Sequence, residues 1–326
     1  MKIRLGYVAI SLTLNDYIHY KTLSFSQYQK LGTEKANVKL TEIILDNLTV
    51  LENILRYNVK NGIYFYRLSQ NMIPLATHPE VDFDYITPFL TKWKRIGQWI
   101  KRHQIRVDFH PDQFCVLNSH RQEVVTSSIK ILEFIYAIYQ ALGIDNGKVV
   151  LHIGSSVMGK KESIERFKKN FFQLPLPLQQ MILLENDDKI YTIEDTLALC
   201  EELHLQMVLD YHHYRCNHTQ YNLDHFLSRI LATWKESGYP PKVHFSSPKS
   251  KQEKRAHSFY LDYKSFVQFL EVIKKYPYDV DIMLECKGKD EALFRLVRQL
   301  KFLYPVKFSK QAVFTLTEDS QEKNSH

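Results

Sequence analysis

Six residues of the types that bind divalent metal ions recur along the chain at intervals of roughly 25–40 residues, about the length of one βα unit. They are His110, His152, Glu185, Asp210, His244 and Glu285. A lone histidine is more often a hydrogen-bonded core or surface residue than a ligand. Buried carboxylates without cations are costly, however, and six such residues at this spacing indicate one shared site. Imidazoles and carboxylates together suit Mn²⁺ or Zn²⁺ better than a thiolate-selecting metal.

Three more histidines could extend this set. His213 lies three residues after Asp210, and His257 lies in the loop after a later predicted strand. Together they could complete a further metal site. His78, which precedes a proline, could join His110 on the opposite side.

Lys242 precedes His244 by two residues, so both side chains should project from the same face of a strand. An ammonium close to metal ions is destabilised. We therefore expect Lys242 to be deprotonated, carboxylated or turned toward a substrate phosphate, and the alternative is a rim lysine that faces solvent. Glu185, Lys242 and Glu285 are the expected catalytic residues, with Glu185 bridging two ions.

A basic loop follows the same predicted strand. It runs from Ser246 and Ser247 through Lys249 and Lys251 to Arg255, and it could neutralise several phosphates of a polynucleotide. A solvated charge run is the alternative interpretation. The net charge of +7 and the pI near 9.0 also favour a polyanionic partner.

Apolar segments rich in β-branched residues alternate with segments of helical periodicity. The predicted strands are 3–8, 63–66, 106–109, 148–153, 181–184, 206–209, 242–245 and 280–284. The predicted helices are 38–57, 85–103, 123–142, 163–172, 193–203, 223–236, 263–275 and 291–301. Eight alternating units over about 300 residues predict an α/β fold, a single-domain TIM (β/α)8 barrel, which would bring the six residues together at its C-terminal face.

We expect the barrel domain to span residues 1–305 and a partly disordered C-terminal extension to span 306–326, with a frayed tail from Thr317. The four cysteines form no Cys-x-x-Cys pair, which indicates reduced thiols. No apolar run approaches the ~20 residues that cross a bilayer, so we expect a cytoplasmic protein without a membrane partner.

Several segments together resemble the ultraviolet damage endonucleases, and they occur in the order of that family. They are Arg4-Leu5-Gly6-Tyr7, Tyr66-Arg67, Thr77-His78-Pro79, His110-Pro111-Asp112-Gln113-Phe114, His152-Ile153-Gly154, Glu185-Asn186-Asp187-Asp188, Asp210-Tyr211-His212-His213, Lys242-Val243-His244-Phe245-Ser246-Ser247-Pro248-Lys249 and Glu285-Cys286-Lys287. The resemblance covers nearly the whole chain to about Leu303.

The resemblance implies a barrel related to endonuclease IV that nicks double-stranded DNA immediately 5′ to cyclobutane pyrimidine dimers and pyrimidine–pyrimidone photoproducts. It implies about two or three Mn²⁺ ions, with Zn²⁺, Co²⁺ or Mg²⁺ as alternatives, and no obligate protein partner. The implied ligands are the nine residues His78, His110, His152, Glu185, Asp210, His213, His244, His257 and Glu285.

The same resemblance assigns lesion recognition. Gln113 and Phe114 would probe the helix, and Tyr7 would line the pocket. Phe114 stands where some members carry tyrosine, which keeps stacking but loses a hydroxyl donor. Ser11 stands where some relatives carry asparagine.

Three alternatives remain open at this stage. An apurinic-site endonuclease shares the phosphodiester chemistry, and a metal-dependent sugar isomerase also uses carboxylates and histidines at a barrel mouth. A noncatalytic damage-binding protein is the third, although recognition alone does not need so many metal ligands.

Overall fold

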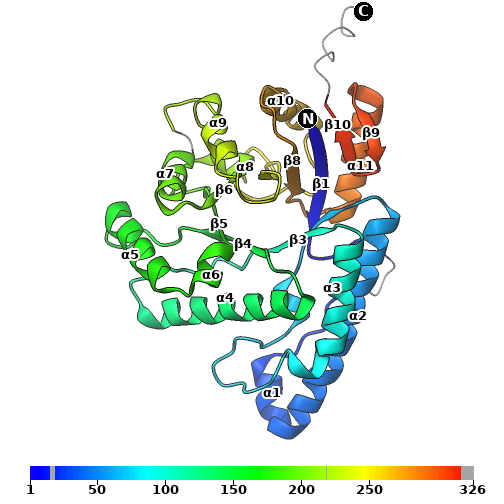
Figure 1. Cartoon of the computed structure of the whole chain (residues 1–326), viewed down its shortest axis with the longest axis vertical. Helices are drawn as coiled ribbons and strands as arrows, with labels where there is room; N and C mark the ends of the chain where they lie inside the picture. Colours follow the sequence, from blue (N-terminus) through cyan, green and yellow to red (C-terminus); the bar gives the residue numbers. More distant parts are fainter. Residues whose placement is uncertain (15–18, 218, 317–326) are drawn as a thin grey trace, which may run out of the picture.

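The computed structural model describes residues 1–14, 19–217 and 219–316. Parallel strands β2 to β8 and β1 form a closed barrel in the order β2-β3-β4-β5-β6-β7-β8-β1, and pairing of β1 with β2 closes it (Figure 1). The strands are β1 (Lys2–Val8), β2 (Phe65–Arg67), β3 (Arg106–Phe109), β4 (Lys148–His152), β5 (Ile182–Glu185), β6 (Gln206–Asp210), β7 (Lys242–Phe245) and β8 (Val280–Leu284). The predicted TIM barrel is confirmed.

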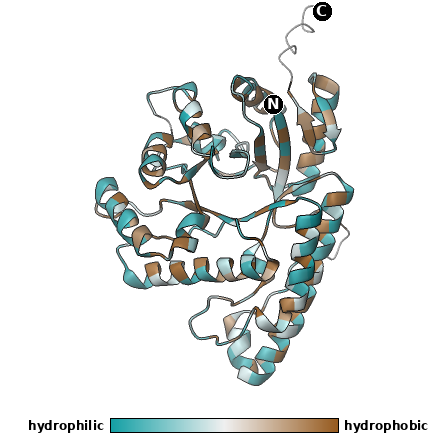
Figure 2. Cartoon of the chain, in the orientation of Figure 1, coloured by the Kyte–Doolittle hydropathy of each residue, from teal (hydrophilic) through white to brown (hydrophobic). Residues whose placement is uncertain are grey.

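Helices surround this barrel. They are α1 (Phe25–Leu31), α2 (Thr33–Lys60), α3 (Leu90–Arg102), α4 (Gln122–Leu142), α5 (Lys160–Gln173), α6 (Leu176–Met181), α7 (Ile193–Leu203), α8 (Tyr211–Cys216), α9 (Asp224–Ala232), α10 (Tyr263–Ile273) and α11 (Lys289–Leu303). Short 3₁₀ turns occupy Gln70–Met72 and Thr87–Phe89. Figure 2 shows hydrophilic and hydrophobic residues alternating along the helices, as expected for elements with one buried face.

The prediction missed α1, α6 and α8. Each has only six or seven residues, which is too short for a helical period to show in the sequence. The start of α8 has a local cause, because Asp210 is its N-cap and accepts a hydrogen bond from the backbone N–H of His213.

Alternate residues of each barrel strand face the interior. Three such residues on neighbouring strands form an apolar layer that packs on Trp234; they are Val150, Leu183 and Val208. The residues two positions further along the same strands are His152, Glu185 and Asp210. They therefore face the interior too, at the C-terminal end of the barrel.

β1 and β2 come unusually close where the barrel closes. A Cβ atom added to Gly6 would lie 2.5 Å from the carbonyl oxygen of Phe65, whose ring packs with Val8 and Met283. A glycine is therefore required at position 6 of this strand.

A C-terminal hairpin extends the sheet beyond the barrel. Strand β10 (Val313–Thr315) pairs antiparallel with β1, and β9 (Lys307–Lys310) pairs with β10. The described part of the expected C-terminal extension, residues 306–316, is thus joined to the sheet by backbone hydrogen bonds. The expected frayed tail, 317–326, lies outside the described residues, and the domain boundary at 305 stays a prediction.

The four cysteines are free thiols, as predicted. Within residues 1–14, 19–217 and 219–316, none of the helices has the length and apolar character needed to cross a membrane.

Candidate active site

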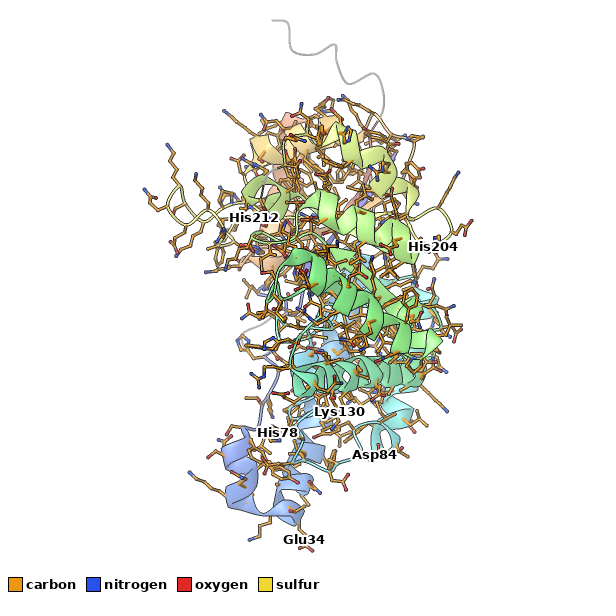
Figure 3. All side chains as sticks on the ribbon, turned by 90° about the vertical axis from the view of Figure 1, so that its left-hand side faces the viewer. Glu34, His78, Asp84, Lys130, His204 and His212 are labelled. Carbon is orange, nitrogen blue, oxygen red and sulfur yellow. The ribbon has the colours of Figure 1, made fainter. Side chains whose placement is uncertain are left out.

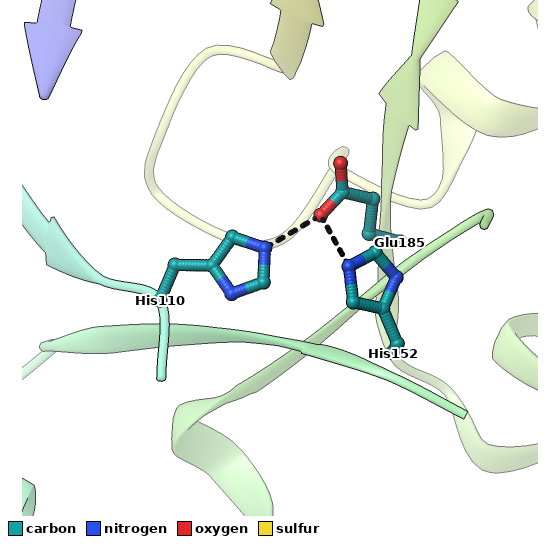
Figure 4. Close-up of side chains that lie close together, drawn as sticks. All are labelled: His110, His152 and Glu185. Carbon is teal, nitrogen blue, oxygen red and sulfur yellow. Dashed lines mark hydrogen bonds and ion pairs between the residues drawn. The ribbon is translucent and has the colours of Figure 1, made fainter. Parts of the chain in front are cut away.

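Glu185, the last residue of β5, is fully buried at the C-terminal end of the barrel. Its Oε2 atom lies 2.9 Å from Nε2 of His110 and 3.6 Å from Nε2 of His152. Figure 4 shows the two imidazoles, which come from the ends of β3 and β4, converging on this oxygen. One carboxylate oxygen thus faces two potential metal ligands.

The other oxygen of Glu185 faces the opposite half of the barrel. Its Oε1 atom lies 2.7 Å from Nδ1 of His244 on β7 and 3.6 Å from Nδ1 of His213 on α8. Nδ1 of His244 is also 3.2 Å from Oε1 of Glu285, which directly follows β8. The turn of α8 after Asp210 is what brings His213 back toward the cluster.

The predicted ligands form three overlapping groups. Within each group, the ligand atoms lie within 4.8 Å of one another. The groups are His110, His152 and Glu185; Glu185, Asp210 and His213; and Asp210, His244 and Glu285. Glu185 and Asp210 are each shared by two groups. Seven of the nine predicted ligands are therefore brought together, although they come from six strands and from α8.

The electrostatics of this cluster fit bound cations. Burial opposes the charge of Glu185, but the imidazoles of His244 and His152 hold the pKa of its carboxyl well below the usual range. Burial, together with the neighbouring carboxylates of Glu185 and Glu285, raises the pKa of Asp210 well above its usual value. Oδ2 of Asp210 is buried and has no hydrogen-bond partner among the described residues. An orphaned carboxylate oxygen among histidine nitrogens is stabilised by a divalent cation, so these residues can hold metal ions.

Asn186, which the prediction did not single out, clamps one of these ligands. Its side chain accepts from the backbone N–H of Asp210 at 2.9 Å and donates to the carbonyl oxygen of Asp210 at 3.0 Å. Its own carbonyl oxygen lies 2.9 Å from Nδ1 of His213. Asn186 thus orients two candidate ligands from the adjoining strand.

Arg67 and Asp108 form a charged layer with Lys242 directly beneath the ligands, and sequence reasoning missed the first two. The guanidinium of Arg67 lies 2.5 Å from Glu285 Oε1 and 2.7 Å from His244 Nε2. The sequence could have indicated both residues. Arg67 is the last residue of β2, and Asp108 lies two residues before His110, so residue alternation along a strand points both side chains into the barrel.

Lys242 points into the barrel, and its Nζ donates to Asp108 Oδ2 at 2.6 Å. The side chain is fully buried, which excludes the alternative of a rim lysine facing solvent. Burial lowers the pKa of Lys242 to about 8, although Asp108 opposes the shift.

A cavity of about 490 Å³ opens beside the cluster. It is lined by His110, His152, His213 and the loops that follow β3, β4 and β5, including Gln113 and Asp187. Phe114 projects from its rim with 70% of its surface exposed. Gln113 and Phe114 thus lie at the mouth of the site, on the loop after β3.

Two predicted ligands lie outside the three groups. The ring centre of His257 is 6.4 Å from that of His213, so His257 approaches the cluster. His78 instead stacks on Phe25 with ring centres 3.8 Å apart, and it lines a separate cavity with Asp112.

Tyr7 is fully buried on the outward face of β1, and its hydroxyl donates to Asn58 of α2 at 2.7 Å. Its neighbours Gly6 and Val8 face the interior. Tyr7 therefore packs against the helical layer and does not line the cavity; the alternation of strand residues could have indicated this.

The basic loop divides into a buried base and an exposed tip. Ser246 and Ser247 are buried, and Oγ of Ser247 accepts from the backbone N–H of Asp262. Lys249 and Lys251 are exposed, and Lys249 pairs with Glu253. Figure 3 shows the loop extending from the side of the molecule that carries His212, whereas His204 lies on the opposite side.

A parallel (β/α)8 barrel with histidines and carboxylates at the C-terminal ends of its strands defines a class of barrel enzymes with metal-binding potential. The family model of the UV-endonuclease UvdE matches residues 3–314. The chain is 40% identical over 308 residues to the UV DNA damage endonuclease of Bacillus cereus strain B4264, a match that covers 94% of this chain and 97% of that protein. It is 39% identical over the same length to the UV DNA damage endonuclease of Bacillus anthracis strain A0248.

Solved structures agree with this assignment. The crystal structure of SacUVDE superposes with a TM-score of 0.82 at 34% identity, over 92% of this chain and 99% of that one. Endonuclease IV from Thermus thermophilus superposes with a TM-score of 0.52 at 16% identity, over 92% of this chain and 98% of that one, which shows a shared fold. The chain belongs to the UV-endonuclease UvdE family and is a DNA endonuclease.

Proposed function

We propose that this endonuclease nicks double-stranded DNA immediately 5′ to UV photolesions by metal-dependent hydrolysis, leaving a 3′-hydroxyl and a 5′-phosphate. The substrates would be cyclobutane pyrimidine dimers and pyrimidine–pyrimidone photoproducts. The observation that carries the proposal is the buried cluster around Glu185, with three groups of ligand atoms within 4.8 Å and an exposed aromatic residue on the rim above.

Three overlapping groups support two or three divalent ions, and the mixed imidazole and carboxylate donors suit Mn²⁺, with Zn²⁺, Co²⁺ or Mg²⁺ as alternatives. When bound, such ions would neutralise the scissile phosphate and lower the pKa of an attacking water. Glu185 would hold two ions through its two oxygens, and Glu285 would be kept in position by Arg67.

For Lys242 we propose two states. As an ammonium it pairs with Asp108 and stabilises the layer beneath the ligands. As a carboxylated lysine it would itself become a ligand. The mass of the intact native protein separates the two, since carboxylation adds the mass of CO₂.

We assign lesion recognition to residues on the rim of the active-site cavity. Damaged bases are already poorly stacked, so extruding them costs less than extruding intact ones. Gln113 and Phe114 are exposed on one loop beside the cavity and could fill the vacated space. The basic tip with Lys249 and Lys251 could neutralise flanking phosphates.

One experiment tests the proposal. Duplexes that carry a single thymine dimer, a pyrimidine–pyrimidone photoproduct or an abasic site are incubated with the protein and Mn²⁺, and the products are mapped. We expect incision directly 5′ to both photolesions that stops in excess chelator. Preferred incision at the abasic site would support an apurinic-site endonuclease instead. If the protein neither binds duplex DNA in a salt-sensitive way nor incises it, the sugar isomerase alternative is reopened. The experiment does not test the location of the protein, and a cytoplasmic location stays a prediction.

A further inference from the structure

The loop between β4 and α5 presents two exposed apolar side chains on the catalytic face. Met158 has 73% of its surface exposed and Val157 has 45%. Loops that follow barrel strands lie at the C-terminal face, and this loop begins directly after His152, the last residue of β4. Gly154 and Ser155, at its start, line the active-site cavity. Met158 lies three residues after Ser155 in the same loop, and its side chain is exposed to solvent.

Met158 has a backbone conformation that favours glycine. Its φ angle is 70°, in the left-handed region, which costs a residue with a side chain roughly 1–2 kcal/mol. Gly159 directly follows it, so a glycine one residue earlier would have satisfied the turn without strain. A large, exposed side chain in this conformation contributes little to stability, so the fold itself does not account for a methionine here.

The loop is held rigidly although its tip is exposed. The carbonyl oxygen of Val157 accepts from Nη2 of Arg166 at 2.6 Å and from Oγ of Ser163 at 3.0 Å. The backbone N–H of Gly159 donates to the carbonyl oxygen of Ser156 at 2.9 Å. A side chain carried by a fixed backbone loses less conformational entropy when it binds.

Further hydrogen bonds join this loop to the loop that carries Phe114. Asn118 donates to the carbonyl oxygen of Ser155 at 2.6 Å and accepts from the N–H of Ser155 at 2.7 Å. Nε of Arg166 donates to the carbonyl oxygen of Asn118 at 3.1 Å. The two loops are therefore connected by hydrogen bonds beside the cavity, with Phe114 exposed on one loop and Val157 and Met158 exposed on the other.

We propose that Met158 is a second apolar contact with the DNA, which packs against the base step beside the lesion while Phe114 fills the other side. Proteins that bend DNA insert methionine, leucine or phenylalanine between base steps, and unstacking is easiest where stacking is already weak. At the start of α5, Lys160 pairs with Asp195, whereas the neighbouring Lys161 is exposed and could contact an adjacent phosphate. This inference rests on the proposed function, because it requires damaged duplex DNA at the cavity.

The test compares Met158→Ala with Met158→Leu and Met158→Gly. Binding is measured by fluorescence anisotropy, with chelator present to prevent incision, on duplexes with and without one thymine dimer. We expect Met158→Ala to weaken binding of the dimer duplex about 5- to 20-fold, in line with one lost base contact, and to change binding of the intact duplex less than about 2-fold. Met158→Leu should keep most of the affinity.

A second measurement reports the contact itself. 2-Aminopurine placed next to the dimer brightens when it unstacks, and we expect the wild-type protein to increase its emission and Met158→Ala to lose most of that increase. Met158→Gly removes both the strain and the side chain, so it should be at least as stable as wild type and yet bind like Met158→Ala. Phe302, 84% exposed at the C-terminal end of α11, provides the matched control Phe302→Ala on the opposite face of the barrel.

The outcomes separate the two proposals. If the wild-type protein does not incise the dimer duplex in Mn²⁺, the proposed function fails. If it incises that duplex, but Met158→Ala matches wild type in affinity and in 2-aminopurine emission, the role of Met158 is wrong. Wild-type affinity in Met158→Gly would overturn it as well, because the side chain would then be dispensable.

Discussion

The ligand cluster is buried in the barrel, whereas the residues on the rim above it are exposed. Glu185, Asp210 and His244 are completely buried, and each is held by partners from other strands. Phe114 and Met158 lie at the same barrel mouth and are largely exposed on loops. Buried charges depend on their neighbours for their protonation state, whereas the rim residues depend only on a rigid backbone. Chemistry and recognition should therefore respond separately to substitution.

The largest effect is expected from Glu185→Gln. This change keeps the shape but removes the anionic charge that two ligand groups share. Since metal ions supply several kcal/mol of transition-state stabilisation, single-turnover incision should fall by at least about 10³-fold. Metal content, measured by mass spectrometry, should fall with it. Glu165→Gln, on the exposed surface of α5, is the control; normal incision by Glu185→Gln would contradict the assignment.

Asp108→Asn should have the next largest effect, and on stability. It leaves the ammonium of Lys242 buried without its charged partner, which costs about 3–5 kcal/mol in unfolding free energy. Urea unfolding in the presence of chelator measures the loss. The double variant Asp108→Leu, Lys242→Met should recover most of it, and its incision rate then shows whether Lys242 serves chemistry or only the fold. Equal stability of Asp108→Asn and wild type would argue against the buried pair.

Phe114→Ala should affect recognition and leave the cluster intact. Loss of one stacked base contact weakens binding of the damaged duplex by about 1–3 kcal/mol. Phe114→Tyr should bind at least as well as wild type, because it keeps the ring. Anisotropy titrations against Phe172→Ala, an exposed residue on α5, check the result. An equal loss on undamaged DNA would mean that Phe114 does not read the lesion.

Lys251→Ala is expected to have a smaller and uniform effect. One lost phosphate contact should reduce the slope of log K against log salt by about 1, on damaged and intact duplexes alike. Lys235→Ala, exposed after α9 on the opposite face, should leave the slope unchanged. A lesion-dependent change would assign this loop to recognition instead of charge neutralisation.

The last prediction is confined to alkaline pH and concerns Lys148, a buried cation at the start of β4 whose Nζ donates to the carbonyl oxygen of Gln180. Burial lowers the pKa of Lys148 from 10.5 to about 8. Between pH 8 and 10.5 the unfolded chain binds a proton at Lys148 that the folded chain does not, so stability rises with pH in this window. Relative to Lys148→Met, wild type should gain unfolding free energy from about pH 8 to about pH 10. If the unfolding free energies of wild type and Lys148→Met changed with pH in the same way, the charge of Lys148 would not be buried.

Much of the fold was predictable from local patterns. Strands 106–109, 242–245 and 280–284 were predicted with the bounds they have, because each carries apolar residues at alternate positions between longer segments of helical periodicity. The hairpin of β9 and β10 was not predicted, since its residues Lys307–Lys310 are polar and its pairing with β1 joins opposite ends of the chain.

Site residues were predictable where a metal-binding residue type occurs at the end of a predicted strand. They were not predictable where contacts with another element determine where the side chain lies. His78 has the right type, but it stacks on Phe25 of α1, a helix that the sequence pattern did not reveal. Tyr7 has the right location along its strand but faces the helices. Ser246 and Ser247 lie beneath the basic tip because the loop folds back on residues near Asp262.

By itself, the sequence determined the order of strands and helices and the types of ligand at the strand ends. Both are local properties that repeat with each βα unit. Only the tertiary structure decided which charges meet. Closure of the barrel brings Lys242 of β7 to Asp108 of β3 and Arg67 of β2 to Glu285 after β8, and these contacts join residues more than 100 positions apart. Partners of buried charges depend on the interior of the closed barrel, which no segment of the chain encodes alone.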